Sequence, residues 1–220
     1  MTITRNGLSL NMIKHIWLDF SETIGSINKE AHNTLRYESY AKFKNKPVTL
    51  ELIQEYEKLY ETHAHSNSAI FKNLGLPAGF WSKLIGMVDP RVHYHLMDPN
   101  IPEVLEKMSK IIPVSIFSNI DLNRILPALG VDIKWFTHIL SANTLEVPKP
   151  ALGGFYKMIE LSSLLPEEIL YIGDHLEKDI IPAKKVGIKT GAVFEKIKEA
   201  DYYFKDFKDI LELIKNEKLV

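Results

Sequence analysis

Residues 168–194 read EILYIGDHLEKDIIPAKKVGIKTGAVF, and this stretch decides the fold class. Its two ends, residues 168–174 and 188–194, are apolar runs of strand length. The segment between them has helical character and stops at Gly187, a residue type that often follows the last turn of a helix. Parallel strands need a long crossover connection, which is usually a helix. The stretch therefore predicts a strand–helix–strand unit of a parallel sheet.

The same alternation continues on both sides of this unit. Further apolar runs of strand length are residues 13–20, 111–119 and 138–142. Segments with helical character are residues 101–110, 122–130, 153–164 and 207–217. Strands that alternate with helices of about ten residues predict an α/β fold, a Rossmann-like doubly wound parallel sheet with helices on both faces. In such sheets ligands bind beyond the carboxyl ends of the strands.

Residues 26–96 differ in character from the rest of the chain. They are rich in Tyr, His, Lys and Glu, and apolar residues recur at helical spacing within residues 49–66. We therefore expect a helical cap subdomain at 26–96, inserted into an α/β core domain formed by residues 12–25 and 97–220. Met12 stands directly before the first strand, so residues 1–11 are expected to be a flexible extension.

The overall composition argues against several classes of protein. The 220 residues carry a formal net charge of -1 with Lys and Arg spread along the chain, which argues against nucleic acid or an anionic membrane as the main partner. No apolar run approaches the ~18 residues needed to cross a bilayer. The absence of cysteine excludes disulfides, thiolate nucleophiles and cysteine-based zinc sites. We expect a cytoplasmic protein that is a monomer or a homodimer.

Four predicted strands lead into side chains that can bind phosphate or a divalent cation. In the order of their strands these are Asp19, then Ser118 and Asn119, then Lys149, then Asp174 and Asp179. A lysine, a hydroxyl group and backbone N–H groups can bind a phosphate. Two carboxylates suffice for Mg²⁺, which keeps several water ligands and a phosphate oxygen. An aspartate can also attack phosphorus. This edge of the sheet is therefore predicted to bind Mg²⁺ and a small phosphorylated substrate.

With these motifs in this order, residues 12–220 resemble the haloacid dehalogenase superfamily, most of whose members are phosphatases, in the subclass with a helical cap after the first strand. Asp19–Thr23 (DFSET) resembles the nucleophile loop of the family, Ser118 its second motif and Lys149 its third. Residues 173–179 (GDHLEKD) resemble its acidic fourth motif, and residues 200–214 its usual ending.

The resemblance implies a metal site at the nucleophile. Asp19 would attack the phosphoryl group and form an aspartyl phosphate. Mg²⁺ would be bound by Asp19, Asp174 and the backbone carbonyl of Ser21. Asp179 would bind the ion directly, or orient Lys149 or a metal-bound water instead.

The resemblance also implies a phosphate-binding set beside the metal ion. Lys149 and Ser118 would hold the phosphoryl group, with Asn119 next to them. Thr23 would brace the nucleophile loop by hydrogen bonding.

Ser21 departs from the pattern of the family's phosphatases, which carry a second Asp two residues after the nucleophile. That Asp protonates the leaving alcohol and later activates the water that cleaves the aspartyl phosphate. A serine hydroxyl cannot act as this general acid and base at neutral pH, so the expected loss in rate is ~10²–10⁴-fold. Glu22 is the nearest spare carboxylate.

Three functions are compatible with Ser21. The first is a phosphatase or phosphotransferase whose substrate has a leaving group that needs little protonation, such as an acyl phosphate. The second is a dehalogenase-type enzyme, in which Asp19 attacks carbon without a metal ion and the acidic motif is typically not intact. The third is a catalytically silent protein that keeps the Mg²⁺ and phosphate pocket. The presence of Lys149 and of both acidic-motif carboxylates favours the first.

Overall fold

The computed structural model describes residues 12–63, 66–77, 79–141 and 149–218. The chain divides into two compact units, Met1–Ser26 with Leu96–Val220, and Ile27–His95. We call the first the α/β unit and the second the helical unit. The predicted extension at residues 1–11 lies outside the described residues.

The α/β unit is built on a six-stranded sheet with the strand order β5-β4-β1-β6-β7-β8. The strands are β1 (His15–Leu18), β4 (Val114–Ser118), β5 (Ile139–Ser141), β6 (Ile169–Gly173), β7 (Lys189–Val193) and β8 (Tyr202–Phe204). Every neighbouring pair in this sheet is parallel. The predicted α/β class with a parallel sheet is therefore confirmed.

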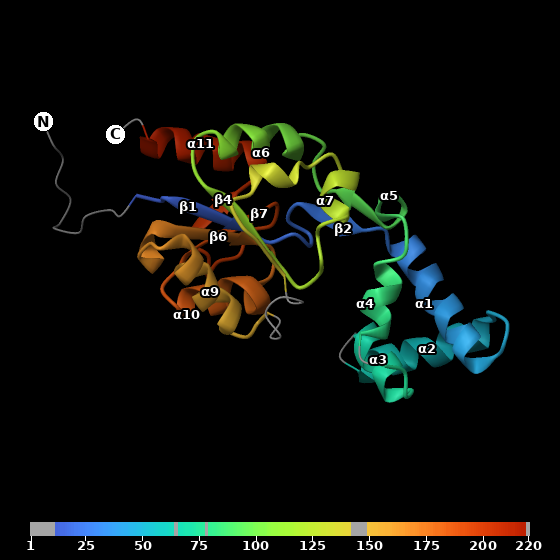
Figure 1. Ribbon diagram of the computed structural model, residues 1–220. Coiled ribbons are helices and arrows are strands. Elements are labelled where there is room, and N and C mark those ends of the chain that lie inside the picture. The colour runs from blue at the N-terminus through green and yellow to red at the C-terminus, as the bar shows by residue number, and fades with distance from the viewer. Residues whose placement is uncertain (1–11, 64–65, 78, 142–148, 219–220) are drawn as a thin grey trace, which may run out of the picture. The chain divides into compact units, whose positions relative to one another are not determined.

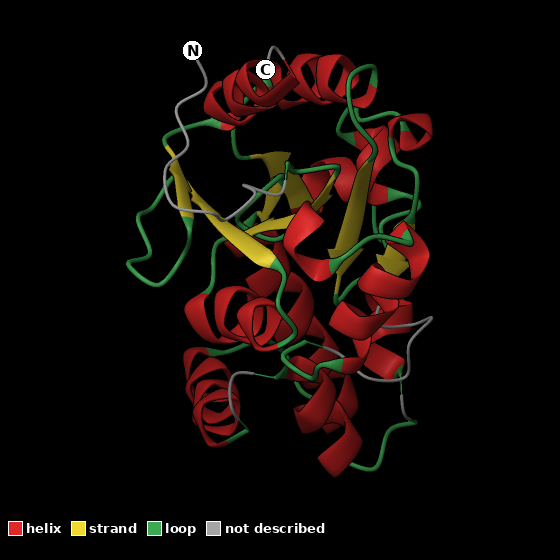
Figure 2. Cartoon of the chain, turned by 90° about the vertical axis from the view of Figure 1, so that its left-hand side faces the viewer, coloured by secondary structure: helices red, strands yellow, loops and turns green. Residues whose placement is uncertain are grey.

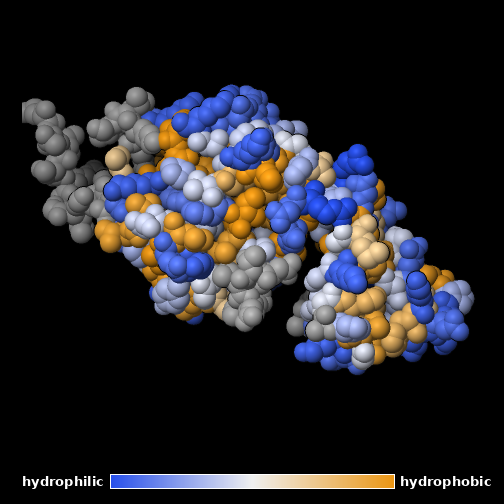
Figure 3. Space-filling view, in the orientation of Figure 1, coloured by the Kyte–Doolittle hydropathy of each residue, from blue (hydrophilic) through white to orange (hydrophobic). Residues whose placement is uncertain are grey.

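Helices on both faces of the sheet explain the apolar sequences of its central strands. β1, β4 and β6 are buried at every position, as expected for strands covered on both sides. In Figure 1, α6 (Ile101–Ser109) and α11 (Phe207–Lys218) lie side by side on one face, and α9 (Gly153–Ser162) and α10 (Ile181–Lys185) lie on the other. Figure 2 shows the strands between these helices from the side. The outer surface of α6 and α11 is largely hydrophilic in Figure 3, so both helices are amphipathic.

Two predicted helices differ in the structure from what their sequence patterns indicate. The helix expected at 122–130 is the single turn α7 (Ile125–Ala128), because Asp121 Oδ1 accepts the N–H of Asn123 and forms a turn before it. The helix expected after Asp174 begins as a π-helical turn (Leu176–Ile180) and continues as α10. Pro182 lies in the first turn of α10, where its missing N–H cannot continue the preceding ladder.

The helical unit has its own apolar core. Its helices are α1 (Lys29–Lys44), α2 (Leu50–Thr62), α3 (Asn67–Asn73), α4 (Phe80–Ile85) and α5 (Pro90–His93). Four of them begin at a polar side chain that accepts a backbone N–H of the first turn, namely Asn28, Thr49, Ser66 and Asp89. Tyr56, Ile70 and Phe71 are fully buried within this unit. Across the described ranges, no helix combines the length and the apolar character that crossing a membrane requires.

A two-stranded sheet of β2 (Gly25–Ile27) and β3 (Tyr94–Leu96) connects the two units along the chain. The sequence pattern did not predict it, because three-residue strands are too short to show alternation. The chain enters the helical unit along β2 and leaves it along β3.

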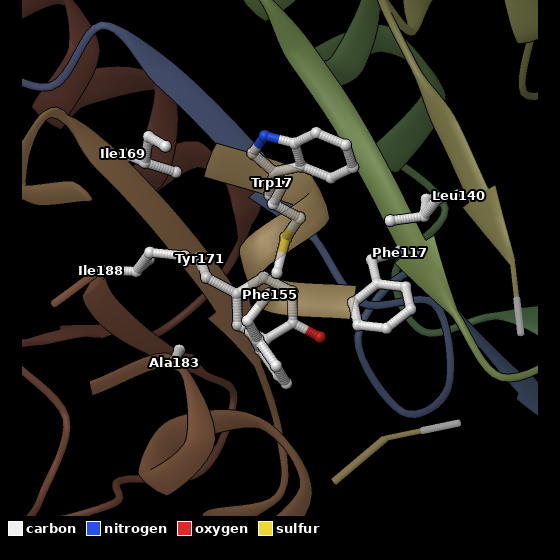
Figure 4. Close-up of a cluster of buried hydrophobic side chains, with 9 residues drawn as sticks. Trp17, Phe117, Leu140, Phe155, Ile169, Tyr171, Ala183 and Ile188 are labelled. Atoms are coloured by element: carbon white, nitrogen blue, oxygen red, sulfur yellow. The ribbon is translucent and has the colours of Figure 1, made fainter. Parts of the chain in front are cut away.

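The core between the sheet and α9 is rich in aromatic side chains. Figure 4 shows Trp17, Phe117, Phe155 and Tyr171 in one buried cluster. Phe155 packs edge-on against both Phe117 and Tyr171, with ring centroids 5.6 and 5.3 Å apart. Because interiors are close-packed, this cluster leaves little freedom to the two strands that carry Phe117 and Tyr171.

We expect Gly154→Ala to destabilise the α/β unit by about 1–3 kcal/mol, the usual effect of overpacking. A Cβ atom on Gly154 would lie 2.2 Å from Cζ of the Phe117 ring, which is fully buried and cannot swing into solvent. Gly153→Ala is the matched control, because nothing lies within 4 Å of its added Cβ. Urea unfolding of the two variants measures the difference, and equal midpoints would contradict the packing argument.

Candidate active site

Asp19 follows β1 directly and faces a buried lysine. Its backbone N–H donates to the carbonyl of Ile172 on β6 at 2.8 Å, so the sheet fixes the start of the loop. Its carboxyl group is buried, and Oδ1 lies 2.7 Å from Lys149 Nζ. Lys149 Nζ also lies 2.7 Å from Asp179 Oδ1. Three residues far apart in the sequence thus form one buried ion-pair network.

Three carboxylates meet in this network. Single oxygen atoms of Asp19, Asp174 and Asp179 lie within 4.8 Å of one another. Burial, together with the charge of Asp179, raises the pKa of Asp19 to about 6 in spite of Lys149. Burial and the charges of Asp19 and Asp179 raise the pKa of Asp174 to about 7. Three carboxylates gathered around one lysine carry more negative than positive charge, which favours a further cation.

The donor set fits Mg²⁺. It offers carboxylate oxygens and no nitrogen or sulfur ligand, as Mg²⁺ prefers. Asp179 is the carboxylate least free to bind the ion. Its Oδ1 accepts hydrogen bonds from Lys149 and from the Tyr171 hydroxyl, and its Oδ2 accepts the backbone N–H of His175 at 3.1 Å. Asp19 and Asp174 are therefore the better candidates for direct ligands.

Gly173 allows Asp179 to come this close. A Cβ atom on Gly173 would lie 2.7 Å from Cγ of Asp179, closer than van der Waals contact permits. The glycine of the GDHLEKD motif is thus needed for the approach of the second carboxylate of that motif.

Asn119 clamps the backbone of Lys149. Its Oδ1 accepts the Lys149 N–H at 2.8 Å, and its Nδ2 donates to the Lys149 carbonyl at 3.1 Å. With both side-chain groups used in this way, Asn119 holds the loop that carries the lysine. The sequence predicts Asn119 as a phosphate-binding residue, whereas in the structure its side-chain amide binds the backbone of Lys149. This contact could not be predicted because no local pattern links the two positions.

Comparison with known proteins identifies the family. A sequence model described as haloacid dehalogenase-like hydrolase matches residues 18–193. The chain belongs to this family. Its fold is similar to that of a HAD phosphatase from Thermococcus onnurineus, with 18% identity and a TM-score of 0.74 over 92% of this chain and 98% of the other. It is also similar to a magnesium-bound HAD hydrolase from Bacillus subtilis, with 15% identity and a TM-score of 0.63 over 92% and 99% of the two chains.

Two curated relatives of this haloacid dehalogenase-like hydrolase match shorter stretches of it. A glyceraldehyde 3-phosphate phosphatase from Methanocaldococcus jannaschii is 29% identical over 38% of this chain and 40% of its own length. The corresponding enzyme from Pyrococcus furiosus is 34% identical over 34% of this chain and 32% of its own length. The chain thus spans less than half the length of the two archaeal phosphatases in these matches.

The remaining predicted site residues of this haloacid dehalogenase-like hydrolase also lie in the α/β unit. Ser118 is buried at the end of β4, and its Oγ accepts the N–H of Ile120 at 3.2 Å. Thr23 is fully buried, and its Oγ1 has no hydrogen-bond partner among the described residues, so the predicted bracing bond is not formed. Ser21 is exposed, and its backbone forms a bridge with Gly25.

Glu22, the spare carboxylate next to Ser21, is directed to the β2 strand. Its side chain accepts a hydrogen bond from Ser26 Oγ, and its backbone N–H donates to Gly25. Its φ of 52° lies in the left-handed region, which is uncommon for residues other than glycine. Glu22 is not among the charged groups that shift the pKa of Asp19. The Glu22 carboxylate is thus bound to β2, which makes Glu22 a poor candidate for a general acid at Asp19.

Proposed function

We propose that this haloacid dehalogenase-like hydrolase is a Mg²⁺-dependent phosphatase or phosphotransferase that acts on a small phosphorylated metabolite through an aspartyl phosphate on Asp19. The observation that carries the proposal is the buried network in which Lys149 Nζ lies 2.7 Å from both Asp19 and Asp179. The helical unit would serve as the cap that admits substrate and excludes water.

In the first step, an Asp19 carboxylate oxygen attacks phosphorus, and the bond between phosphorus and the leaving-group oxygen breaks. Lys149, held at Asp19, would neutralise charge on the phosphoryl oxygens as the new bond forms. Asp19 and Asp174 would hold Mg²⁺, with the Ser21 carbonyl as a third ligand, and Asp179 would orient Lys149. When bound, Mg²⁺ would supply positive charge at a phosphoryl oxygen.

Water then attacks phosphorus of the aspartyl phosphate, which releases phosphate and regenerates Asp19. Ser21 cannot donate a proton to the leaving group or accept one from this water at neutral pH. The proposed substrates are therefore phosphates with good leaving groups, such as acyl phosphates.

A dehalogenase-type reaction is less well supported, because it needs no metal site, whereas three carboxylates converge here.

We expect hydrolysis of acetyl phosphate to require Mg²⁺ and to be abolished by EDTA. p-Nitrophenyl phosphate should be hydrolysed more slowly, and glyceraldehyde 3-phosphate belongs in the same panel because it is in the names of the two archaeal relatives. Phosphate release is the measurement, with Ca²⁺ as the control ion, since it prefers more ligands at longer distances. Turnover that survives EDTA would contradict the metal site. No turnover of any phosphate with Mg²⁺ would favour the silent binding protein.

A further inference from the structure

Tyr171 has a polar contact that its place in an apolar strand does not suggest. It is the third residue of β6, it is fully buried, and its ring packs in the cluster of Figure 4. Its hydroxyl oxygen lies 2.8 Å from Lys149 Nζ and 2.8 Å from Asp179 Oδ1. Burial raises the pKa of the phenol well above its ordinary value, so Tyr171 keeps its proton.

The Lys149 ammonium group has one hydrogen-bond acceptor for each of its N–H bonds. An ammonium group has three N–H bonds, and three acceptors lie within 2.8 Å of Nζ, namely Asp19 Oδ1, Asp179 Oδ1 and the Tyr171 oxygen. The phenol accepts from Lys149 and donates its single proton to Asp179. Tyr171 is thus the neutral member of a closed ring of hydrogen bonds.

Hydrogen bonds hold Lys149 in place at both its backbone and its ammonium group. Asn119 holds the lysine backbone, and Tyr171 and Asp179 hold the ammonium group at the other end of the side chain. The ammonium also lies 5.5 Å from the centroid of the Tyr171 ring and 5.4 Å from that of Phe117, within the range of cation–π attraction. A long, flexible side chain is thereby held in one place.

We propose that Tyr171 is a positioning residue, whose hydroxyl keeps the Lys149 ammonium against the attacking oxygen of Asp19. This inference rests on the proposed phosphoryl transfer. The hydroxyl itself contacts neither Asp19 nor substrate in the proposal and acts through Lys149 alone. Because a displacement of about 1 Å at a catalytic group can cost ~10²-fold in rate, loss of this one hydroxyl is expected to reduce turnover.

Tyr171→Phe tests the inference, because it keeps the ring that packs against Phe155 and removes the hydroxyl. We expect kcat for acetyl phosphate to fall ~10–100-fold while KM stays within about twofold, since Lys149 acts on the transition state. The Mg²⁺ concentration for half-maximal activity should not change, because Tyr171 is not among the proposed ligands. An unchanged kcat, or an equal change in KM, would overturn the inference.

Tyr56→Phe is the matched control. Tyr56 is also fully buried, and its hydroxyl donates to Asn67 Oδ1 at 2.7 Å within the helical unit. The substitution deletes the same atom and one buried hydrogen bond. Its kcat should equal that of the unsubstituted protein at a temperature where both are folded. If both variants lose kcat to the same extent, the loss reflects stability, and the positioning role is refuted.

An independent measurement separates this inference from the proposed function. In protein labelled with ¹⁵N-lysine, a buried and hydrogen-bonded ammonium should give a slowly exchanging NMR signal, assigned to Lys149 by its absence in Lys149→Met. In Tyr171→Phe this signal should shift and exchange faster with water, whatever the enzyme turns over. An unchanged signal would overturn the positioning role even if phosphatase activity is found, and a changed signal would support it even if none is found.

Discussion

Asp19→Asn is expected to lower the rate of acetyl phosphate hydrolysis by ~10⁴-fold or more and to remove any covalently phosphorylated protein. Nucleophile substitutions in enzymes with covalent intermediates reach ~10⁶-fold. An amide nitrogen and oxygen cannot form the aspartyl phosphate, although the side chain keeps its size and its position after β1. The Lys149 ammonium would lose one of its two ion-pair partners on the sheet edge but keep Asp179.

The measurement is mass spectrometry of acid-quenched protein during turnover, together with phosphate release. Asp201→Asn is the control, because it also removes a carboxylate that pairs with a lysine, Lys184, at 2.7 Å. That variant should still gain one phosphoryl group in the presence of Mg²⁺ and acetyl phosphate. Phosphorylated protein in Asp19→Asn would show that another residue is the nucleophile, and the proposed mechanism would fail.

The fold could be predicted because its central strands are buried on both faces. A continuous apolar run such as residues 168–174 is easy to recognise as a strand that is covered on both faces. The glycines and helical segments between such runs indicate the crossover connections. Helix ends were less predictable. The chain from Leu176 to Lys185 has continuous helical character, and only Pro182 hints that it changes from a π-helical turn to an α-helix.

The charged part of the candidate site could also be predicted, since carboxyl ends of parallel strands converge on one edge. Asp19, Lys149, Asp174 and Asp179 do lie together there. The supporting contacts could not. Tyr171 looks like an ordinary core residue of an apolar strand, and the clamp of Asn119 on Lys149 joins positions 30 residues apart. Such contacts depend on side-chain directions in three dimensions, which periodicity does not record.

Ser21→Asp is expected to raise the rate of p-nitrophenyl phosphate hydrolysis by up to ~10²-fold, the lower end of what general acid–base catalysis contributes. Ser21 is exposed, so a carboxylate can be accommodated without repacking the core. It would protonate the leaving oxygen and later accept a proton from the hydrolytic water. Acetyl phosphate should gain less in the first step, because its leaving group needs little protonation.

Ser21→Asn separates the chemistry of the carboxylate from its shape. Asn has nearly the size of Asp and cannot transfer a proton at neutral pH, so it should leave the preference for activated phosphates unchanged. The quantity to compare is the ratio of rates for poor and good leaving groups in the three proteins, measured at saturating Mg²⁺. This ratio should rise in Ser21→Asp alone.

If Asp and Asn have the same effect, or if all substrates gain equally, then Ser21 does not set the substrate preference through the missing proton transfer. If Mg²⁺ still binds but none of the three proteins hydrolyses any phosphate, an added acid and base is not enough for catalysis. The protein would then be a catalytically silent one that binds Mg²⁺.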